Sequence, residues 1–329
     1  MAYTAIDNPG LYFAVQLRTA ATGDPEYDIG FQPNMVWDKC RSIAGVHALY
    51  DSVRGVGASG KVLYPHTTGG EADNALMKSF DSDGFTIESD ADHSAGVTLV
   101  DWCWKETATA GFDIVSYTGN GSARTISHSL SAVPKFIIVK NRESDENWRL
   151  YHAGVASDAE TDEIYLDLTN AAVDTDSAWN DTAPTSSVFS VGTNHGVNKS
   201  DEGHIAYLFA DVQGFSKFGS YVGNGNANGT FVYTGFRPAM VIIKTSSYAS
   251  QNWGLWDTKR DTGNITEVEL NPNDNSPDDS TGNKIDILSN GFKCKVSYDA
   301  TNRSGETYIY MAWAEAPLVN SEGVPCNAR

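Results

Sequence analysis

The sequence lacks two features that would suit a membrane or nucleic-acid protein. It has no uninterrupted run of 18 apolar residues, whereas a membrane-spanning helix needs about 20. Basic residues are few: 23 lysines and arginines stand against 42 aspartates and glutamates, which gives a net charge of −19. Such an acidic chain repels phosphate groups. We therefore expect neither insertion into a membrane nor binding to nucleic acid.

Residues that carry metal or catalytic chemistry are also scarce or poorly spaced. The four cysteines follow no CxxC or Cys/His spacing, so a zinc site is not expected. Buried thiols are the favoured interpretation, with a disulfide left open. The seven histidines form no HxH or HExxH pattern, and no GxSxG nucleophile elbow occurs. We expect no enzyme activity.

What the sequence does contain is one pattern written three times. The prolines of successive copies are 101 and 104 residues apart, the lysines repeat these steps, and the closing aromatic residues are 105 and 104 apart. Each copy carries a proline (Pro33, Pro134, Pro238), a lysine six residues later (Lys39, Lys140, Lys244) and a closing aromatic residue (Trp104, Phe209, Trp313).

This period predicts the domain organisation. About 100 residues is too long for a solenoid unit of 20–50 residues and fits a small domain. We therefore predict three tandem domains and not one domain with internal stacking. The expected parts are an N-terminal arm at 1–11, modules at 12–110, 111–213 and 214–317, and a C-terminal tail at 318–329.

Short β-rich stretches separated by turn residues indicate an all-β fold. Examples are Met35–Cys40 and Thr98–Trp104. Phe136–Val139 and Tyr308–Trp313 are wholly apolar or aromatic, which predicts strands covered on both faces. No segment keeps a helical period over 11 residues. We predict three tandem β-sandwich modules of the jelly-roll or lectin-like kind, with the strand order left open.

Several stretches carry a family resemblance. They are Leu49–Gly55, Ser79–Thr86 and Trp102–Lys105, together with Tyr-Thr-Gly-Asn-Gly at 117–121 and the Pro–hydrophobic–Lys strand at 134–140. These residues resemble a repeat module of tailed-phage virion proteins, especially those of phages that infect marine bacteria and cyanobacteria. The similarity covers residues 5–329, although Ala20–Asp24 replaces the Gly-Asn-Gly turn in the first copy.

The resemblance implies a function as well as a fold. We expect a non-enzymatic structural protein on the surface of a tailed-phage virion, assembled in the host cytoplasm. Its favoured place is a tail appendage, fibre or adaptor that takes part in host-surface attachment. The alternatives are a capsid decoration protein and a lectin-like carbohydrate-binding receptor protein. Expected partners are other tail or capsid proteins, further copies of the chain and a host-surface glycan.

Three aromatic residues are the candidates for ligand binding. Aromatic residues that recur at the repeat period are expected in the core, whereas Trp179, Tyr248 and Tyr298 do not recur. These three are predicted to lie at the surface and to bind ligand as stacking platforms for sugars.

Two acidic loops and two glycine turns complete the candidates. Asp158–Asp162 and Asn271–Asp279 could supply oxygens to Ca²⁺, the one cofactor considered, but neither has the EF-hand order. Exposed, solvated loops are the favoured interpretation of both. Gly119–Gly121 and Gly223–Gly225 lack the full GxGxxG phosphate-binding pattern. They are predicted to be tight turns with positive φ.

Overall fold

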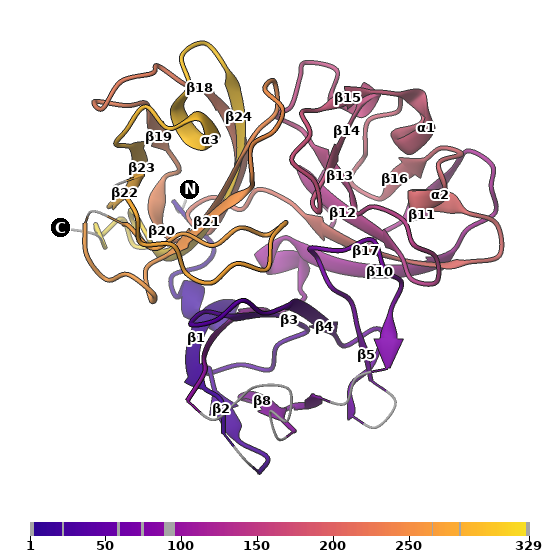
Figure 1. The fold of residues 1–329 in the computed structure, drawn as a ribbon, viewed down its shortest axis with the longest axis horizontal. Coiled ribbons are helices and arrows are strands. Elements are labelled where there is room, and N and C mark those ends of the chain that lie inside the picture. Colours follow the sequence, from indigo (N-terminus) through magenta and orange to yellow (C-terminus); the bar gives the residue numbers. More distant parts are fainter. Residues whose placement is uncertain are drawn as a thin grey trace.

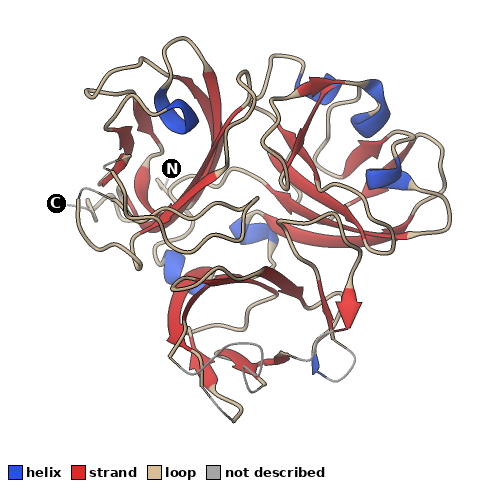
Figure 2. Cartoon of the chain, viewed as in Figure 1, coloured by secondary structure: helices blue, strands red, loops and turns tan. Residues whose placement is uncertain are grey.

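The computed structural model confirms the all-β class. It describes residues 3–21, 23–57, 60–73, 76–88, 96–264, 266–282 and 284–326. Strands make up 42% of the chain and helices 7%. The antiparallel sheets form three lobes around a common centre (Figures 1 and 2). Among the described residues, no helix combines the length and the apolar character that a membrane crossing requires.

Each lobe contains an inner sheet built from four equivalent strands. Lobe 1 has β1 (Phe13–Thr19), β3 (Met35–Cys40), β4 (His47–Asp51) and β9 (Thr98–Trp104); lobe 2 has β10 (Phe112–Thr118), β12 (Phe136–Asn141), β13 (Arg149–His152) and β17 (Gly203–Phe209); lobe 3 has β18 (Ser216–Val222), β20 (Phe236–Thr245), β21 (Gly254–Asp257) and β24 (Thr307–Pro317). The strand orders are β1-β9-β3-β4, β10-β17-β12-β13 and β18-β24-β20-β21. In every lobe the closing strand therefore lies between the first and the second strands.

A smaller outer sheet faces each inner sheet from the periphery of the molecule. The outer strands are β2 (Glu26–Asp28), β7 (Met77–Phe80) and β8 (Gly84–Ile87) in lobe 1; β11 (Arg124–Ser127) and β16 (Val188–Val191) in lobe 2; and β19 (Phe231–Tyr233), β22 (Ile285–Leu288) and β23 (Gly291–Cys294) in lobe 3. In lobe 1, β8 is the central strand of its three; in lobe 3, β23 is.

The remaining elements are short. Lobe 1 has a two-stranded sheet of β5 (Lys61–Val62) and β6 (Ala72–Asp73). The inner sheet of lobe 2 is extended by two further strands, β14 (Asp162–Tyr165) and β15 (Val173–Asp174). The helices span three or four residues each: η1 (Pro9–Leu11), η3 (Ala108–Ala110), η4 (Ala159–Thr161), α1 (Asp176–Trp179), α2 (His195–Asn198) and α3 (Asp299–Asn302).

The inner strands bury both of their faces. In β12, Phe136 and Ile138 belong to the central hydrophobic cluster, whereas Ile137 and Val139 belong to a cluster private to lobe 2. Alternate residues of a strand point to opposite faces, so one face of this sheet packs on the molecular centre and the other on its own lobe. The prediction of two-sided burial for Phe136–Val139 is confirmed.

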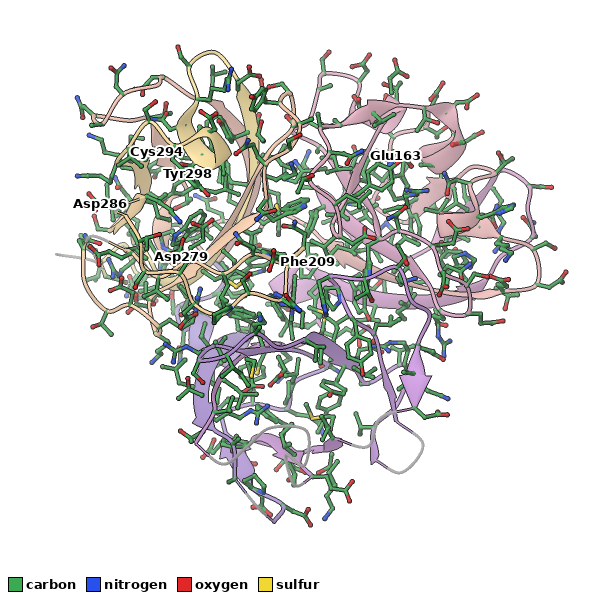
Figure 3. The ribbon with its side chains drawn as sticks, in the orientation of Figure 1. Glu163, Phe209, Asp279, Asp286, Cys294 and Tyr298 are labelled. Atoms are coloured by element: carbon green, nitrogen blue, oxygen red, sulfur yellow. The ribbon has the colours of Figure 1, made fainter. Side chains whose placement is uncertain are left out.

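The three closing aromatic residues meet at the centre of the molecule. The ring centroids of Trp104 and Phe209 are 6.4 Å apart, those of Trp104 and Trp313 are 5.4 Å apart, and those of Phe209 and Trp313 are 5.5 Å apart. Figure 3 shows Phe209 where the three lobes converge. Beside these rings lies an apolar cavity of about 20 Å³, which is the room for one water molecule.

The central cluster crosses the predicted module boundaries. The boundaries at 110/111 and 213/214 lie in the short connections that precede β10 and β18, yet the cluster collects buried side chains from all three lobes. The tandem-domain prediction did not include this shared core. Independent folding of each module stays a prediction, and the shared core argues against it because an isolated lobe would expose its central face to water.

The described residues of the arm and of the tail pack on lobe 3. Tyr3 donates a hydrogen bond to the Gly235 carbonyl at 2.8 Å. Asp7 of the N-terminal arm accepts a hydrogen bond from the Ser321 backbone N–H in the C-terminal tail at 2.7 Å. Residues 1–2 of the predicted arm and 327–329 of the predicted tail lie outside the described residues. The arm and the tail thus contact each other beside the same lobe.

The cysteine and glycine-turn predictions can be compared directly with the structure. All four cysteines are free; Cys40, Cys103 and Cys294 are buried, whereas Cys326 is exposed. The turn interpretation of the Gly-Asn-Gly segments is confirmed, since Gly121 has φ 70° and Gly225 has φ 68°.

A substitution at the centre tests whether the lobes depend on one core. Phe209→Ala is expected to lower the free energy of unfolding by about 3–5 kcal/mol and to speed hydrogen exchange in the inner strands of all three lobes. Phe189→Ala is the matched control, because Phe189 is as buried but belongs to the private cluster of lobe 2. Loss of protection confined to lobe 2 in both variants would contradict the shared core.

Candidate functional site

The repeated lysines are buried at the joints between lobes. Lys140 lies near the end of β12 and is fully buried. Its Nζ donates hydrogen bonds to the carbonyls of Thr68 at 2.9 Å, Glu146 at 2.9 Å and Ser144 at 3.4 Å. Thr68 belongs to lobe 1 and the other two to the hairpin of lobe 2. Burial lowers the pKa of Lys140 to about 8, so the ammonium form present at neutral pH is held by carbonyl dipoles that span the joint.

The same arrangement recurs at the other two joints. Lys244 of lobe 3 donates to the Thr169 carbonyl of lobe 2 at 3.2 Å. Lys39 of lobe 1 donates to the Asn275 carbonyl of lobe 3 at 3.0 Å. Burial lowers the pKa of each of these lysines to about 8 as well. Because lobe 1 binds lobe 3 in this way, the three joints close into a ring.

Each joint is completed by a segment that we call the strap: Tyr64–Glu71, Tyr165–Ala172 and Asn271–Asp278. The strap residue three positions after the lysine-binding carbonyl donates its backbone N–H to a carbonyl of the neighbouring lobe. That carbonyl belongs to the residue two positions after the lysine. The bonds are Glu71 to Arg142 at 2.7 Å, Ala172 to Ser246 at 2.8 Å and Asp278 to Arg41 at 2.8 Å. Because the spacing is identical at all three joints, the contacts between lobes repeat as regularly as the lobes themselves.

An aromatic ring nitrogen holds the start of each strap. Trp148 Nε1 donates to the Tyr64 carbonyl at 3.3 Å and also to the Thr67 carbonyl at 3.1 Å. Trp253 Nε1 donates to the Tyr165 carbonyl at 3.0 Å. At the third joint His47 takes the place of tryptophan, and its Nε2 lies 3.0 Å from the Asn271 carbonyl. The Nδ1 of His47 accepts the Trp37 indole N–H, so the proton of the neutral ring is on Nε2 and points at the strap.

The prediction of an exposed, solvated loop at Asn271–Asp279 holds only in part: Asn275, Ser276 and Pro277 are exposed, but Pro272 is buried and the side chains of Asp278 and Asp279 are paired. Asp278 forms ion pairs of 2.9 Å with Arg41 of lobe 1 and Arg260 of lobe 3. Asp279 pairs with Lys284. The loop is polar because it binds lysine and arginine of two lobes, a partnership that the local sequence does not display.

The other acidic loop, Asp158–Asp162, brings carboxylates of neighbouring strands close together. The pKa of Asp162 is raised, mainly by burial and further by the charges of Asp158 and Asp174. Asp162 lies opposite Asp174 where the strands β14 and β15 pair. Within the described part of the chain, no three His, Cys, Asp or Glu side chains are grouped so that they could hold a metal ion.

A second set of contacts also runs around the ring. Tyr207 of lobe 2 donates its hydroxyl to Asp51 of lobe 1 at 2.6 Å, and Trp102 of lobe 1 donates its indole N–H to Asp257 of lobe 3 at 3.1 Å. Each aspartate is fully buried and forms an ion pair with the arginine three residues later, Arg54 or Arg260. A buried carboxylate is stable only with such partners.

At the joint between lobes 2 and 3, all three positions of this set hold different residues. Met311 occupies the position of Trp102 and Tyr207 and has no hydrogen to donate. His152 stands in place of the aspartate, and its Nε2 lies 3.2 Å from the Tyr310 carbonyl. Val155 stands in place of the arginine. Burial lowers the pKa of His152 to about 4, so at this joint the second set of contacts uses neutral groups where the other two joints use charged ones.

Lobe 1 also contains a buried carboxyl pair. Arg18 donates to Asp101 at 2.9 Å and also pairs with Asp38, and all three side chains are almost wholly inaccessible. Burial raises the pKa of Asp101 well above its usual range; Arg18 opposes this effect, and the charge of Asp38 adds to it. The residues lie on the outward face of the inner sheet, beneath the outer sheet. Their burial suits a structural role better than catalysis, which needs contact with a substrate.

The predicted ligand-binding residues do not come together. Trp179 is 2% exposed and packs edge-on against Tyr151 in the private cluster of lobe 2. Tyr298 and Tyr248 are half-buried in lobe 3 near the two ends of α3, where Lys284 lies 4.9 Å from the ring centre of Tyr298 and Arg303 lies 3.9 Å from that of Tyr248. Ligand binding by all three stays a prediction, and the burial of Trp179 speaks against it.

Sequence reasoning used the repeated lysines as markers of the period and assigned them no role. A lysine that recurs at the end of an apolar strand is unusual, because lysine is rarely buried without a partner. That recurrence was the signal for the joints. The partner carbonyls carry no side-chain signature, so no inspection of the sequence could have located them.

Removing one lysine tests the joint. Lys140→Met keeps the apolar stem and leaves three carbonyls without their donor, so the free energy of unfolding is expected to fall by about 3 kcal/mol. The exposed residue Lys259 supplies the control, since Lys259→Met should change stability by about 0.5 kcal/mol or less. Denaturant titration measures both. A loss for Lys140→Met no larger than that of the control would remove the lysine from the account of the joint.

Substitutions at the joint between lobes 2 and 3 test the second set of contacts. His152→Asp alone places an unpaired carboxylate in the interior and is expected to cost about 3–5 kcal/mol. Adding Val155→Arg and Met311→Tyr supplies the partners present at the other two joints and should recover at least half of that loss. Thermal and denaturant unfolding of the single and triple variants measure the recovery, and its absence would show that the three joints are not equivalent.

Comparison with known proteins places the whole ring in one family. No curated protein matches the chain. Residues 8–317 match a single family model, described as a domain of unknown function, DUF7483. The matched range begins in the arm and ends at the last residue of β24, so one model spans all three lobes and their joints. The chain therefore belongs to the DUF7483 family.

Proposed function

We propose that the chain is a non-enzymatic structural protein made of three tandem β-sandwich modules joined into a ring. The single observation that carries this proposal is the closed cycle of lysine and strap contacts. In each joint a buried ammonium group binds carbonyls of its own lobe and of a neighbouring lobe. Such a cycle stiffens the molecule because no lobe can turn without breaking contacts at two joints.

The use of ionisable residues supports the same proposal. Lys39, Lys140 and Lys244, whose pKa values burial lowers to about 8, are all engaged with backbone carbonyls. The buried aspartates at the joints are engaged with arginines. Perturbed pKa values often mark catalytic groups, but here the same residue types recur at equivalent joints, as expected of structural contacts.

The place of the protein is inferred from its resemblance to virion proteins of tailed phages. We place it on the virion surface, as a tail appendage, fibre or adaptor component that takes part in host-surface attachment. A rigid block with outward-facing sheets suits the presentation of binding surfaces. Capsid decoration and lectin-like receptor binding are the alternatives, and the exposed aromatic residues Phe231 and Tyr233 favour a role in glycan binding over pure decoration.

Cryo-EM of the whole particle tests the location. Density for the three-lobed ring is expected on the tail; density on the capsid shell would favour decoration, and its absence from the particle would overturn the virion proposal.

A reducing-sugar assay with purified protein tests the non-enzymatic part. No release of reducing ends from host-surface polysaccharide is expected, and turnover would overturn that part.

A further inference from the structure

The repeat provides an internal control for the outer sheets. In each outer sheet, one of the two edge strands comes first in the chain: β2, β11 or β19. The register of these strands is fixed by the inward pairs Tyr27–Phe85, Ile126–Phe189 and Val232–Phe292. Residues on either side of the inward residue point outward. These positions hold Glu26 and Asp28 in lobe 1, Thr125 and Ser127 in lobe 2, and Phe231 and Tyr233 in lobe 3.

Lobe 3 therefore differs from its two relatives at matched positions. Phe231 is 44% exposed and Tyr233 is 47% exposed. Exposed single apolar residues are common on proteins, but two aromatic rings side by side on an edge strand, where the equivalent strands carry acids or hydroxyls, form a distinct surface. The scaffold does not demand aromatic residues here, since two other lobes build the same strand without them.

Neighbouring residues turn the two rings into a platform. Lys293 of β23 lies opposite Phe231, and Gly291 lies opposite Tyr233. Leu288 of β22 follows opposite Gly291. A Cβ atom at Gly291 would stand 2.0 Å from the Val232 carbonyl, so the position requires glycine, and Gly291 itself is buried. We call Phe231, Tyr233, Leu288, Gly291 and Lys293 the aromatic platform.

The platform lies on the outer rim of the molecule. In Figure 1 the strands β19, β23 and β22 form the outward side of lobe 3, away from the other lobes. Figure 3 shows Asp286, the β22 neighbour of Lys293, on the same rim. Asp286 forms its ion pair with Lys295 at 2.8 Å. The platform therefore faces away from the ring contacts.

Addition of a peptide strand to β19 is disfavoured by what already covers its edge. Lys217 Nζ donates to the Tyr233 carbonyl at 3.1 Å, and the Tyr3 hydroxyl donates to the Gly235 carbonyl at 2.8 Å. An added strand needs a run of free backbone donors and acceptors, and β19 has only three residues. Recognition must then use the side chains that stand on the face.

Two lysines stand beside the rings of an otherwise acidic molecule, and the nearby Asp286 is paired with Lys295. The whole chain carries −19, yet Lys217 and Lys293 flank the rings. Lys293 Nζ is bonded to the neutral Asn228 side chain and Lys217 to a backbone carbonyl. In the part of the chain that the structure describes, neither lysine forms an ion pair. A ligand with flat apolar faces would stack on the rings, and negative groups on it would meet the lysines.

We propose that the aromatic platform of lobe 3 binds an acidic polysaccharide of the uronic-acid type. The apolar face of a sugar ring stacks on Phe231 or Tyr233, and a carboxylate pairs with Lys293 or Lys217. Its biological meaning rests on the proposed role in host-surface attachment, because the platform would then be the surface that holds the host glycan.

Calorimetric titration of the full chain with a hexamer of galacturonic acid at low salt tests the proposal, with cellohexaose as the neutral comparison. The wild type is expected to bind the acidic hexamer at least tenfold more tightly than the neutral one. Phe231→Thr with Tyr233→Ser installs the residues of lobe 2 and should weaken binding at least tenfold. Val173→Thr, which changes an exposed residue of lobe 2, should leave binding unchanged.

Lys293→Gln provides a second, milder variant. It should weaken binding of the acidic hexamer about threefold to tenfold and reduce its dependence on salt. Equal binding by the wild type and the Phe231/Tyr233 variant, no binding by the wild type, or capture of an extended peptide at the platform in place of the saccharide would each overturn the proposal. These outcomes are separate from the location of the protein on a particle, which tests the proposed function alone.

Discussion

The buried ammonium group at each joint is the constraint on which the rest of the structure depends. A lysine placed among apolar strands must find oxygen atoms, and one lobe alone supplies only some of them. The neighbouring strap supplies the others, as Thr68, Thr169 and Asn275 do. The need to satisfy a single cation thus fixes the position of a whole segment of the next lobe. Because the same need arises three times, the solution closes on itself and the central aromatic residues are brought into contact.

Much of the fold within each lobe could be predicted, because it follows from local patterns. The strands expected at Met35–Cys40 and Thr98–Trp104 have those bounds in the structure. Burial of both faces of Phe136–Val139 could be predicted from the sequence, because a strand with one solvent-exposed face would alternate between apolar and polar residues. The common core was not visible, since apolar residues that face the centre and those that face the private cluster look alike in a sequence.

The candidate site was harder to predict for a related reason. A strap is recognised through backbone carbonyls, which every residue possesses, so Asn271–Asp279 reads as a solvated loop until its lysine partner is seen. Choosing Trp179 because it does not recur also misjudged burial, as a private lobe cluster can use a ring that no other lobe has. The informative departures are those at matched positions of the repeat, such as Phe231 against Thr125.

The terminal segments have a consequence for how the molecule can be rearranged. The arm and the tail meet through Asp7 and Ser321 beside lobe 3. A short artificial linker between them would make the backbone circular, and a new opening could then be cut at either of the other junctions, near residues 107–111 or 211–215. Three permuted chains with different first residues would then share one scaffold. A cargo fused at the new ends would sit close to the meeting point of the three lobes, because Trp104, Phe112, Phe209 and Phe215 beside these junctions belong to the central cluster.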